Sequence, residues 1–95
     1  MANDRQAIII DRQDNVATAI IDLPAGSLIQ TERGAVLLLR DIPFGHKFAL
    51  SDIPQGGYIL KYGAQIGCAT ASIAAGDHVH VHNVQDITDE IRKGA

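Results

Sequence analysis

A five-residue motif, Asp-aliphatic-Pro-x-Gly, constrains the fold of this chain more than any other feature of its sequence. Three copies begin at Asp22, Asp41 and Asp52, and together they contain all three prolines. A fourth, degenerate copy begins at Ser72. Proline fixes φ at the first central position of a turn, and glycine supplies a positive φ or a close backbone approach, so each copy predicts a sharp corner. Because the copies are unevenly spaced, they favour a pseudo-symmetric β fold with similar corners over a solenoid of fixed period.

Short apolar and β-branched runs lie between these corners, and we expect each of them to form a strand. The runs are residues 7–11, 16–21, 28–31, 35–39, 47–50, 58–62, 66–69 and 78–84. Many short strands separated by Gly and Pro turns are typical of an all-β barrel or clip-like fold.

The end of the chain follows a different pattern. Residues 86–93 carry acidic side chains first and basic ones last, and a glycine follows them. This order predicts either a short helix or a frayed linker. We therefore expect one all-β domain over residues 1–85, followed by a tail or short helix over residues 86–95 that leads to a linker.

Composition excludes several classes of function. Hydrophobic residues make up 46% of the 95 residues, with only two Phe, two Tyr and no Trp, so the core is expected to consist of Ile, Leu, Val and Ala. The net charge is −3 and the basic residues are scattered, which argues against nucleic-acid binding. A single cysteine excludes an internal disulfide and fits a reducing compartment. The polar N-terminus lacks the apolar stretch of a signal peptide, and no segment approaches about 20 apolar residues, so we expect a cytoplasmic chain without a membrane span.

The sharpest chemical pattern is a run of alternating histidines, His78, His80 and His82, followed by Asn83. On a strand these three histidines share one face, with neighbours about 6.5–7 Å apart along the backbone. Two imidazoles of a His-x-His pair can then meet one metal ion, and neutral imidazole is a common ligand for Zn, Fe, Ni and Cu. Because a single strand does not easily supply three ligands to one ion, groups from elsewhere are expected to complete the site. Acid–base chemistry, hydrogen bonding to a substrate carboxylate, and an exposed face that merely tolerates histidine are the alternatives.

A second candidate site is the sequence Gly45-His46-Lys47, at the end of the second corner. A glycine turn followed by His and Lys can present two cationic donors to an anion. From composition alone, a solvated turn that tolerates a histidine explains the same residues. Cys68 lies in an apolar run, where a small buried side chain is expected.

Several segments together resemble the N-terminal domain of the altronate and galactarate dehydratase family. They are residues 14–19, 41–50, 61–69 and 76–84, which contain the second corner, the Gly-His-Lys turn and the histidine run. The resemblance extends from about residue 7 to residue 84, which is nearly the whole chain. It implies a SAF domain with a β-clip fold.

The family resemblance also implies a reaction, a cofactor and a partner. The reaction is elimination of water from a polyhydroxy acid, assisted by a divalent metal, usually Fe(II). The partner domain is expected to supply most of the metal's ligands. The related sulfolactate sulfo-lyase, which eliminates sulfite, has a separate small subunit of about this size beside a large one. We therefore expect the chain to be incompetent alone and to act with a large catalytic subunit or C-terminal domain on a sugar acid or 2-hydroxy carboxylate.

Carried over to this sequence, the resemblance gives roles to individual residues. Catalysis is expected from His46, Lys47 and His80, substrate binding from Lys47 and Asn83, and metal binding from His78, His80 and His82. Lys47 would hold the substrate carboxylate as a point charge.

Two other kinds of function remain open from the sequence. SAF units also occur as non-catalytic modules that bind carbohydrate or a partner protein, although such modules give no reason for the histidine run. A metal-storage or metal-sensing protein is supported by the histidines alone. Exposed strand edges in so small a fold also allow a homo-oligomer.

Overall fold

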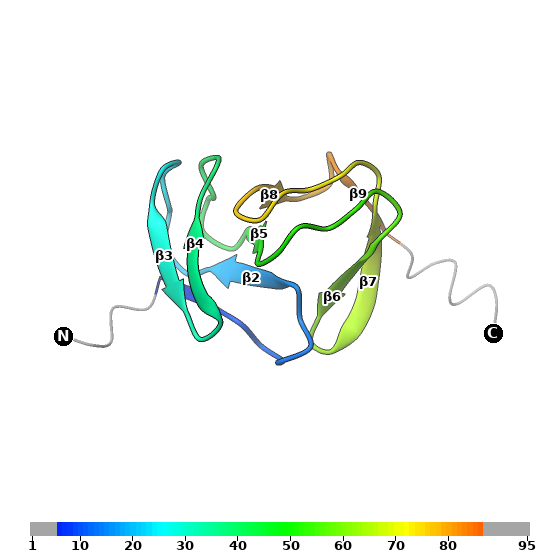
Figure 1. Ribbon diagram of the computed structural model, residues 1–95, viewed down its shortest axis with the longest axis horizontal. Helices are drawn as coiled ribbons and strands as arrows, with labels where there is room; N and C mark the ends of the chain where they lie inside the picture. The colour runs from blue at the N-terminus through cyan, green and yellow to red at the C-terminus, as the bar shows by residue number, and fades with distance from the viewer. Residues whose placement is uncertain (1–5, 87–95) are drawn as a thin grey trace.

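The computed structural model describes residues 6–86, and all of the regular structure in this range is β-strand (Figure 1). The strands are β1 (Ala7–Ile8), β2 (Val16–Ala19), β3 (Leu28–Thr31), β4 (Gly34–Leu37), β5 (Lys47–Ala49), β6 (Tyr58–Lys61), β7 (Ala64–Ala69), β8 (His78–Val79) and β9 (Val84–Asp86). Every strand pair is antiparallel. The predicted all-β fold is therefore confirmed. Residues 6–86 contain no helix that could span a membrane.

The strands form three small sheets. A four-stranded sheet with the order β1-β2-β5-β8 occupies the middle, the hairpin β3-β4 lies at one end, and the sheet β6-β7-β9 lies at the other (Figure 1). Strand β8 is an edge strand of the middle sheet, so one of its sides is not paired within that sheet. This edge position leaves room for side chains of β8 and of the following loop to meet groups outside the sheet.

The four corners join in two pairs. Leu23 of the first corner exchanges two backbone hydrogen bonds with Ile42 of the second, at 2.9 and 2.7 Å, and Ile53 exchanges two with Ile73, at 2.7 and 2.8 Å. All four aliphatic side chains are buried in the core. The corner motif thus places one apolar side chain inside the molecule at each reversal of the chain.

Aspartates tie the corners of a pair to each other. Asp22 accepts a hydrogen bond from the N–H of Phe44, and Asp41 accepts one from the N–H of Ala25, both at 2.8 Å. These two reciprocal hydrogen bonds hold the first and second corners together.

In the second pair of corners this exchange is one-sided. Asp52 accepts from the N–H of Ala75 at 2.9 Å. Ser72 holds the place of the fourth aspartate, and among residues 6–86 its side chain makes no equivalent bond to Gln55. The degenerate copy of the motif therefore donates a hydrogen bond to the aspartate of the third corner, but within the described residues its own Ser72 side chain accepts none in return.

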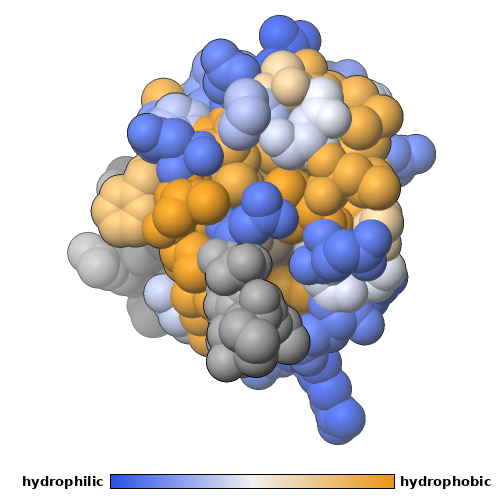
Figure 2. All heavy atoms as spheres, turned by 90° about the vertical axis from the view of Figure 1, so that its left-hand side faces the viewer, coloured by the Kyte–Doolittle hydropathy of each residue, from blue (hydrophilic) through white to orange (hydrophobic). Residues whose placement is uncertain are grey.

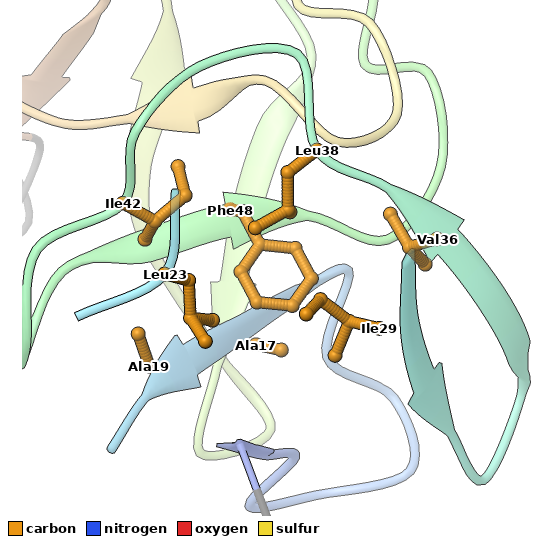
Figure 3. Packing of buried hydrophobic residues seen from close by; sticks show 8 residues of the cluster. All are labelled: Ala17, Ala19, Leu23, Ile29, Val36, Leu38, Ile42 and Phe48. Atoms are coloured by element: carbon orange, nitrogen blue, oxygen red, sulfur yellow. The ribbon is translucent and has the colours of Figure 1, made fainter. Parts of the chain in front are cut away.

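The core consists of two clusters on either side of β5. Phe48 is fully buried in the first cluster, with Leu23, Ile29 and Leu38 around its ring (Figure 3). The next residue, Ala49, is fully buried in the second cluster. Successive side chains of a strand point to opposite faces, so the three-residue strand β5 serves both clusters.

The β3-β4 hairpin shows the same alternation between core and surface. Ile29 and Val36 are paired and buried, whereas the neighbouring pair Leu28 and Leu37 is more than half exposed. Figure 2 views this end of the molecule and shows apolar side chains gathered among polar ones.

One strand prediction is wrong. Residues 78–84 do not form a single strand, because β8 ends at Val79, the chain turns, and β9 begins at Val84. The physical reason is Asn83, whose side chain bonds the backbone of His78 and His80 and so holds a turn in place. The helix-or-linker prediction for residues 86–93 lies outside the described residues, apart from Asp86, which ends β9.

Candidate metal centre

Strand pairing brings His46 next to the histidines of the final run. Strands β5 and β8 are antiparallel neighbours in which Phe48 lies opposite His78, and Lys47 lies opposite Val79. One step further along this register, His46 faces His80. Residues that face each other across an antiparallel pair project to the same side of the sheet, so three imidazoles gather on one face.

The three rings are stacked in close contact. The ring centroids of His46 and His80 are 4.2 Å apart with an interplanar angle of 8°. His78 lies 5.0 Å from His46 and 5.2 Å from His80. One ring nitrogen from each of the three residues lies within 4.8 Å of the other two, and all three side chains are half-buried. We call His46, His78 and His80 the imidazole triad.

Nδ1 of His46 and Nε2 of His78 are only 2.8 Å apart. A contact this short is a hydrogen bond in which one nitrogen donates its proton and the other accepts with a lone pair. The two rings therefore cannot both be protonated at the facing nitrogens.

The surroundings favour the neutral forms of His78 and His80. Burial lowers the pKa of His78, and the neighbouring His46, His80 and His82 lower it further, while Asp77 acts in the opposite direction. The pKa of His80 is also lowered, first by burial and then by the nearby histidines and Lys47. Neutral imidazoles keep the lone pairs that metal binding requires.

The donor set of the triad fits a transition metal. Imidazole nitrogens bind Zn²⁺ at about 2.0–2.1 Å, so two ligands at the tetrahedral angle lie about 3.3 Å apart. The facing nitrogens of His46 and His78 are 2.8 Å apart, so a small separation of the two rings would let both bind one ion. Three nitrogen ligands suit Zn, Fe, Ni or Cu better than Mg or Ca, which prefer oxygen.

His82, a predicted ligand, lies beside the triad and not within it. Its exposed ring is 5.3 Å from that of His78 and tilted by 42°. The turn after Val79 separates His82 from the face that His78 and His80 share. His46, predicted as a catalytic residue in a separate corner, instead lies with the histidine run.

The two residues predicted to bind substrate have different surroundings. Lys47 is half-buried, and its pKa is lowered by burial and by the charge of Lys61, a residue that the sequence analysis did not single out. Asn83 is buried, and both polar atoms of its side chain bond the backbone. Nothing in the sequence near Lys61 indicates that it lies close to Lys47, because the fold alone brings them together.

The fold and the site define a small all-β domain that presents three imidazoles beside a lysine. The family model of the altronate/galactarate dehydratase SAF domain matches residues 5–87, and the chain belongs to this family. The predicted resemblance is confirmed.

Individual relatives agree with this assignment. The chain is 49% identical over 80 residues to an altronate dehydratase of Escherichia coli, which covers 84% of this chain and 16% of that protein. An altronate dehydratase of Bacillus subtilis is 38% identical over 85 residues, which covers 90% of this chain and 17% of that protein. A (2R)-sulfolactate sulfo-lyase subunit alpha of Chromohalobacter salexigens is 32% identical over 85 residues, with 82% of this chain and 90% of that subunit covered. The chain thus spans about a sixth of the dehydratases' length but nearly all of the sulfo-lyase subunit.

Proposed function

We propose that this chain is the small domain or subunit of a metal-assisted lyase that eliminates water, or sulfite, from a sugar acid or related 2-hydroxy carboxylate. The observation that carries the proposal is the convergence of His46, His78 and His80 in a chain whose relatives are dehydratases and a sulfo-lyase. The half-buried free thiol of Cys68 fits a reducing compartment, and we assign the chain to the cytoplasm.

The chain acts together with a larger catalytic polypeptide. Its match covers only 16% of the E. coli altronate dehydratase, so most of a comparable active site would come from elsewhere. The triad is half-exposed beside the edge strand β8, where a second polypeptide or a substrate can reach it. We therefore place the triad at the contact between this domain and the large catalytic part.

The triad would hold one divalent metal, for which Fe(II) is the first candidate. Such a metal would polarise substrate oxygens and stabilise the negative charge that develops during elimination. An imidazole whose lone pair is occupied by a metal cannot also carry the substrate proton. We therefore assign His46 and His80 to ligation, and we assign the base that takes the proton to the large catalytic part.

The elimination itself breaks two bonds and forms one double bond. A base takes the proton from the carbon next to the carboxylate, and the electron pair of that C–H bond forms a C=C bond. Hydroxide or sulfite leaves from the following carbon, and hydroxide takes up a proton to become water. For a 2-hydroxy acid, the resulting enol rearranges to a 2-oxo acid.

Lys47 binds the substrate carboxylate in this proposal. It follows His46 directly in the chain, and its charge is close enough to lower the pKa of His80. The neighbouring Lys61 adds a second positive charge. The Lys47 ammonium near a metal would hold an anionic substrate and offset the charge that develops on it.

The test combines this chain with the large catalytic polypeptide from the same source. We expect release of a 2-oxo acid only when both are present with Fe(II), and loss of this activity in the His46→Ala variant. A large polypeptide that reaches the same rate alone, with a small chain that binds carbohydrate by itself, would contradict the proposal and favour a non-catalytic binding module.

A further inference from the structure

Asn83 bonds the backbone on both sides of Val79. Its Oδ1 accepts from the N–H of His80 at 2.9 Å, and its Nδ2 donates to the carbonyl oxygen of His78 at 2.7 Å. The residue is only 8% exposed, so these bonds are largely shielded from water. A single carboxamide thus holds the backbone of two of the three triad residues.

The backbone of Asn83 is anchored as well. Its N–H donates to the carbonyl oxygen of His80 at 3.1 Å, and its own carbonyl oxygen accepts from the N–H of Thr70 at 2.9 Å. Thr70 follows β7, so Asn83 connects the triad to the sheet at one end of the molecule. The loop after β8 therefore has little freedom to move relative to that sheet.

The molecule contains a second carboxamide with the same pattern and no histidines. Oδ1 of Asn15 accepts from the N–H of Leu60 at 2.8 Å, and its Nδ2 donates to the carbonyl oxygen of Tyr58 at 2.9 Å. Tyr58 is the second residue after the glycine of the third corner, and His78 is the second residue after the glycine of the fourth. Asn15 is therefore a matched internal control for Asn83.

We propose that Asn83 is a positioning residue of the metal centre, which fixes the backbone of His78 and His80 so that their imidazoles meet that of His46. This role rests on the proposed function as far as the metal is concerned. It differs from direct substrate binding because both polar atoms of the Asn83 side chain are already bonded to the backbone. Groups that orient metal ligands from outside the ligand set typically change metal affinity by about 10–100-fold when they are removed.

The experiment measures Co(II) binding to the full-length chain and to two pairs of variants, Asn83→Ala with Asn15→Ala, and Asn83→Asp with Asn15→Asp. The aspartate variants keep the acceptor for one N–H and replace the donated bond by an oxygen facing a carbonyl oxygen. Each variant is measured at a temperature at which circular dichroism shows it to be folded. We expect both Asn83 variants to bind Co(II) about 10–100-fold more weakly and with an altered visible spectrum, and both Asn15 variants to bind like the unmodified chain.

A second readout needs no metal. Nitrogen-15 NMR of the metal-free chain reports the hydrogen bond between the rings of His46 and His78. We expect this bond to survive in the Asn15 variants and to be lost in the Asn83 variants. If the unmodified chain binds no Co(II) but this pattern holds, the proposed metal role fails and the positioning role stands. Asn83 variants that keep both the affinity and the ring contact, or Asn15 variants that lose them equally, would overturn the inference.

Discussion

Two polar clusters of this domain differ in how completely their hydrogen bonds are made. Asp14 is only 1% exposed, and its carboxylate accepts from the N–H groups of Asp11, Tyr62 and Gly63 at 3.0, 3.0 and 2.8 Å. Arg33 reaches the same place and bonds the carbonyl oxygens of Asp14 and Asp11. The imidazole triad is half-exposed instead, and its hydrogen bond between rings joins two of its own members, His46 and His78.

The difference indicates that the Asp14 cluster stabilises the fold, whereas the imidazole triad is available for function. Asp14 joins the turn before β2 to the β6-β7 hairpin, and its buried carboxylate already accepts three backbone hydrogen bonds. The triad combines like groups whose positive forms repel one another, an arrangement that contributes little to folding. A metal would satisfy the lone pairs of the triad, whereas the bonds of Asp14 are already satisfied within the protein.

The largest expected effect on folding is that of Asp14→Ala. The change removes three part-buried hydrogen bonds to a charged acceptor, so we expect a loss of about 3 kcal/mol in the free energy of unfolding. Denaturant unfolding measures it. The control is Asp22→Ala, which removes one exposed bond and should cost about 1 kcal/mol. Equal losses of stability in the two variants would contradict the larger structural role assigned to Asp14.

The triad should show the opposite behaviour. We expect His46→Ala to weaken metal binding at least about 100-fold and His82→Ala less than about 10-fold, because only His46 belongs to the triad. Both variants should change the free energy of unfolding by no more than about 1 kcal/mol, since neither side chain is fully buried. Calorimetric titration with Zn(II) and denaturant unfolding measure the two effects. Similar affinity losses at His46 and His82 would place the site elsewhere in the histidine run.

Acid should destabilise the metal-free chain through the triad. The pKa of His78 is lowered by burial and then by His46, His80 and His82, with Asp77 opposing. The unfolded chain therefore takes up a proton more readily than the folded chain. The stability that this group contributes is present above its unfolded pKa of about 6.5 and is lost as the pH falls through the lower folded value. In His78→Gln, the free energy of unfolding should decline less between pH 7 and pH 5. If the free energy of unfolding of His78→Gln declined as much as that of the unmodified chain, protonation of His78 would not explain the loss of stability in acid.

The smallest effect concerns the incomplete corner. Ser72→Asp places a carboxylate where the other three corners have one, within reach of the N–H of Gln55. We expect a gain of about 0.5–1 kcal/mol in the free energy of unfolding, because the site is exposed and one bond is added. Ala71→Asp adds the same charge without the corner geometry and serves as the control. A gain of the same size in both variants would show that charge alone explains it.

Local signals predicted the corners and much of the sheet structure. Proline and glycine determine the corners through backbone geometry, and the strand over residues 28–31 has the predicted bounds. The run from His78 to Val84 misled the prediction because its alternating valines are typical of a strand. The turn inside it depends on the side chain of Asn83, which bonds backbone groups that no periodicity reveals.

The candidate site was predicted in parts. The sequence singled out His78, His80 and His46. These residues come together only because β5 pairs with β8, and a single sequence does not reveal that register. Asp14 lies between the preceding turn and β2. Its buried role depends on Tyr62 and Gly63, which lie 48 and 49 residues further along the chain. Long-range contacts therefore account for most of what the sequence did not reveal.

X-ray absorption spectroscopy of the chain loaded with one equivalent of Zn(II) tests whether His46, His78 and His80 bind one metal ion. We expect three imidazole nitrogens at about 2.0–2.1 Å from the metal, with solvent oxygen completing the coordination shell. The same spectrum recorded on His46→Ala should lose one imidazole. A metal with fewer than three imidazoles in the unmodified chain, or an identical spectrum in His46→Ala, would contradict the assignment of His46, His78 and His80 as one metal site.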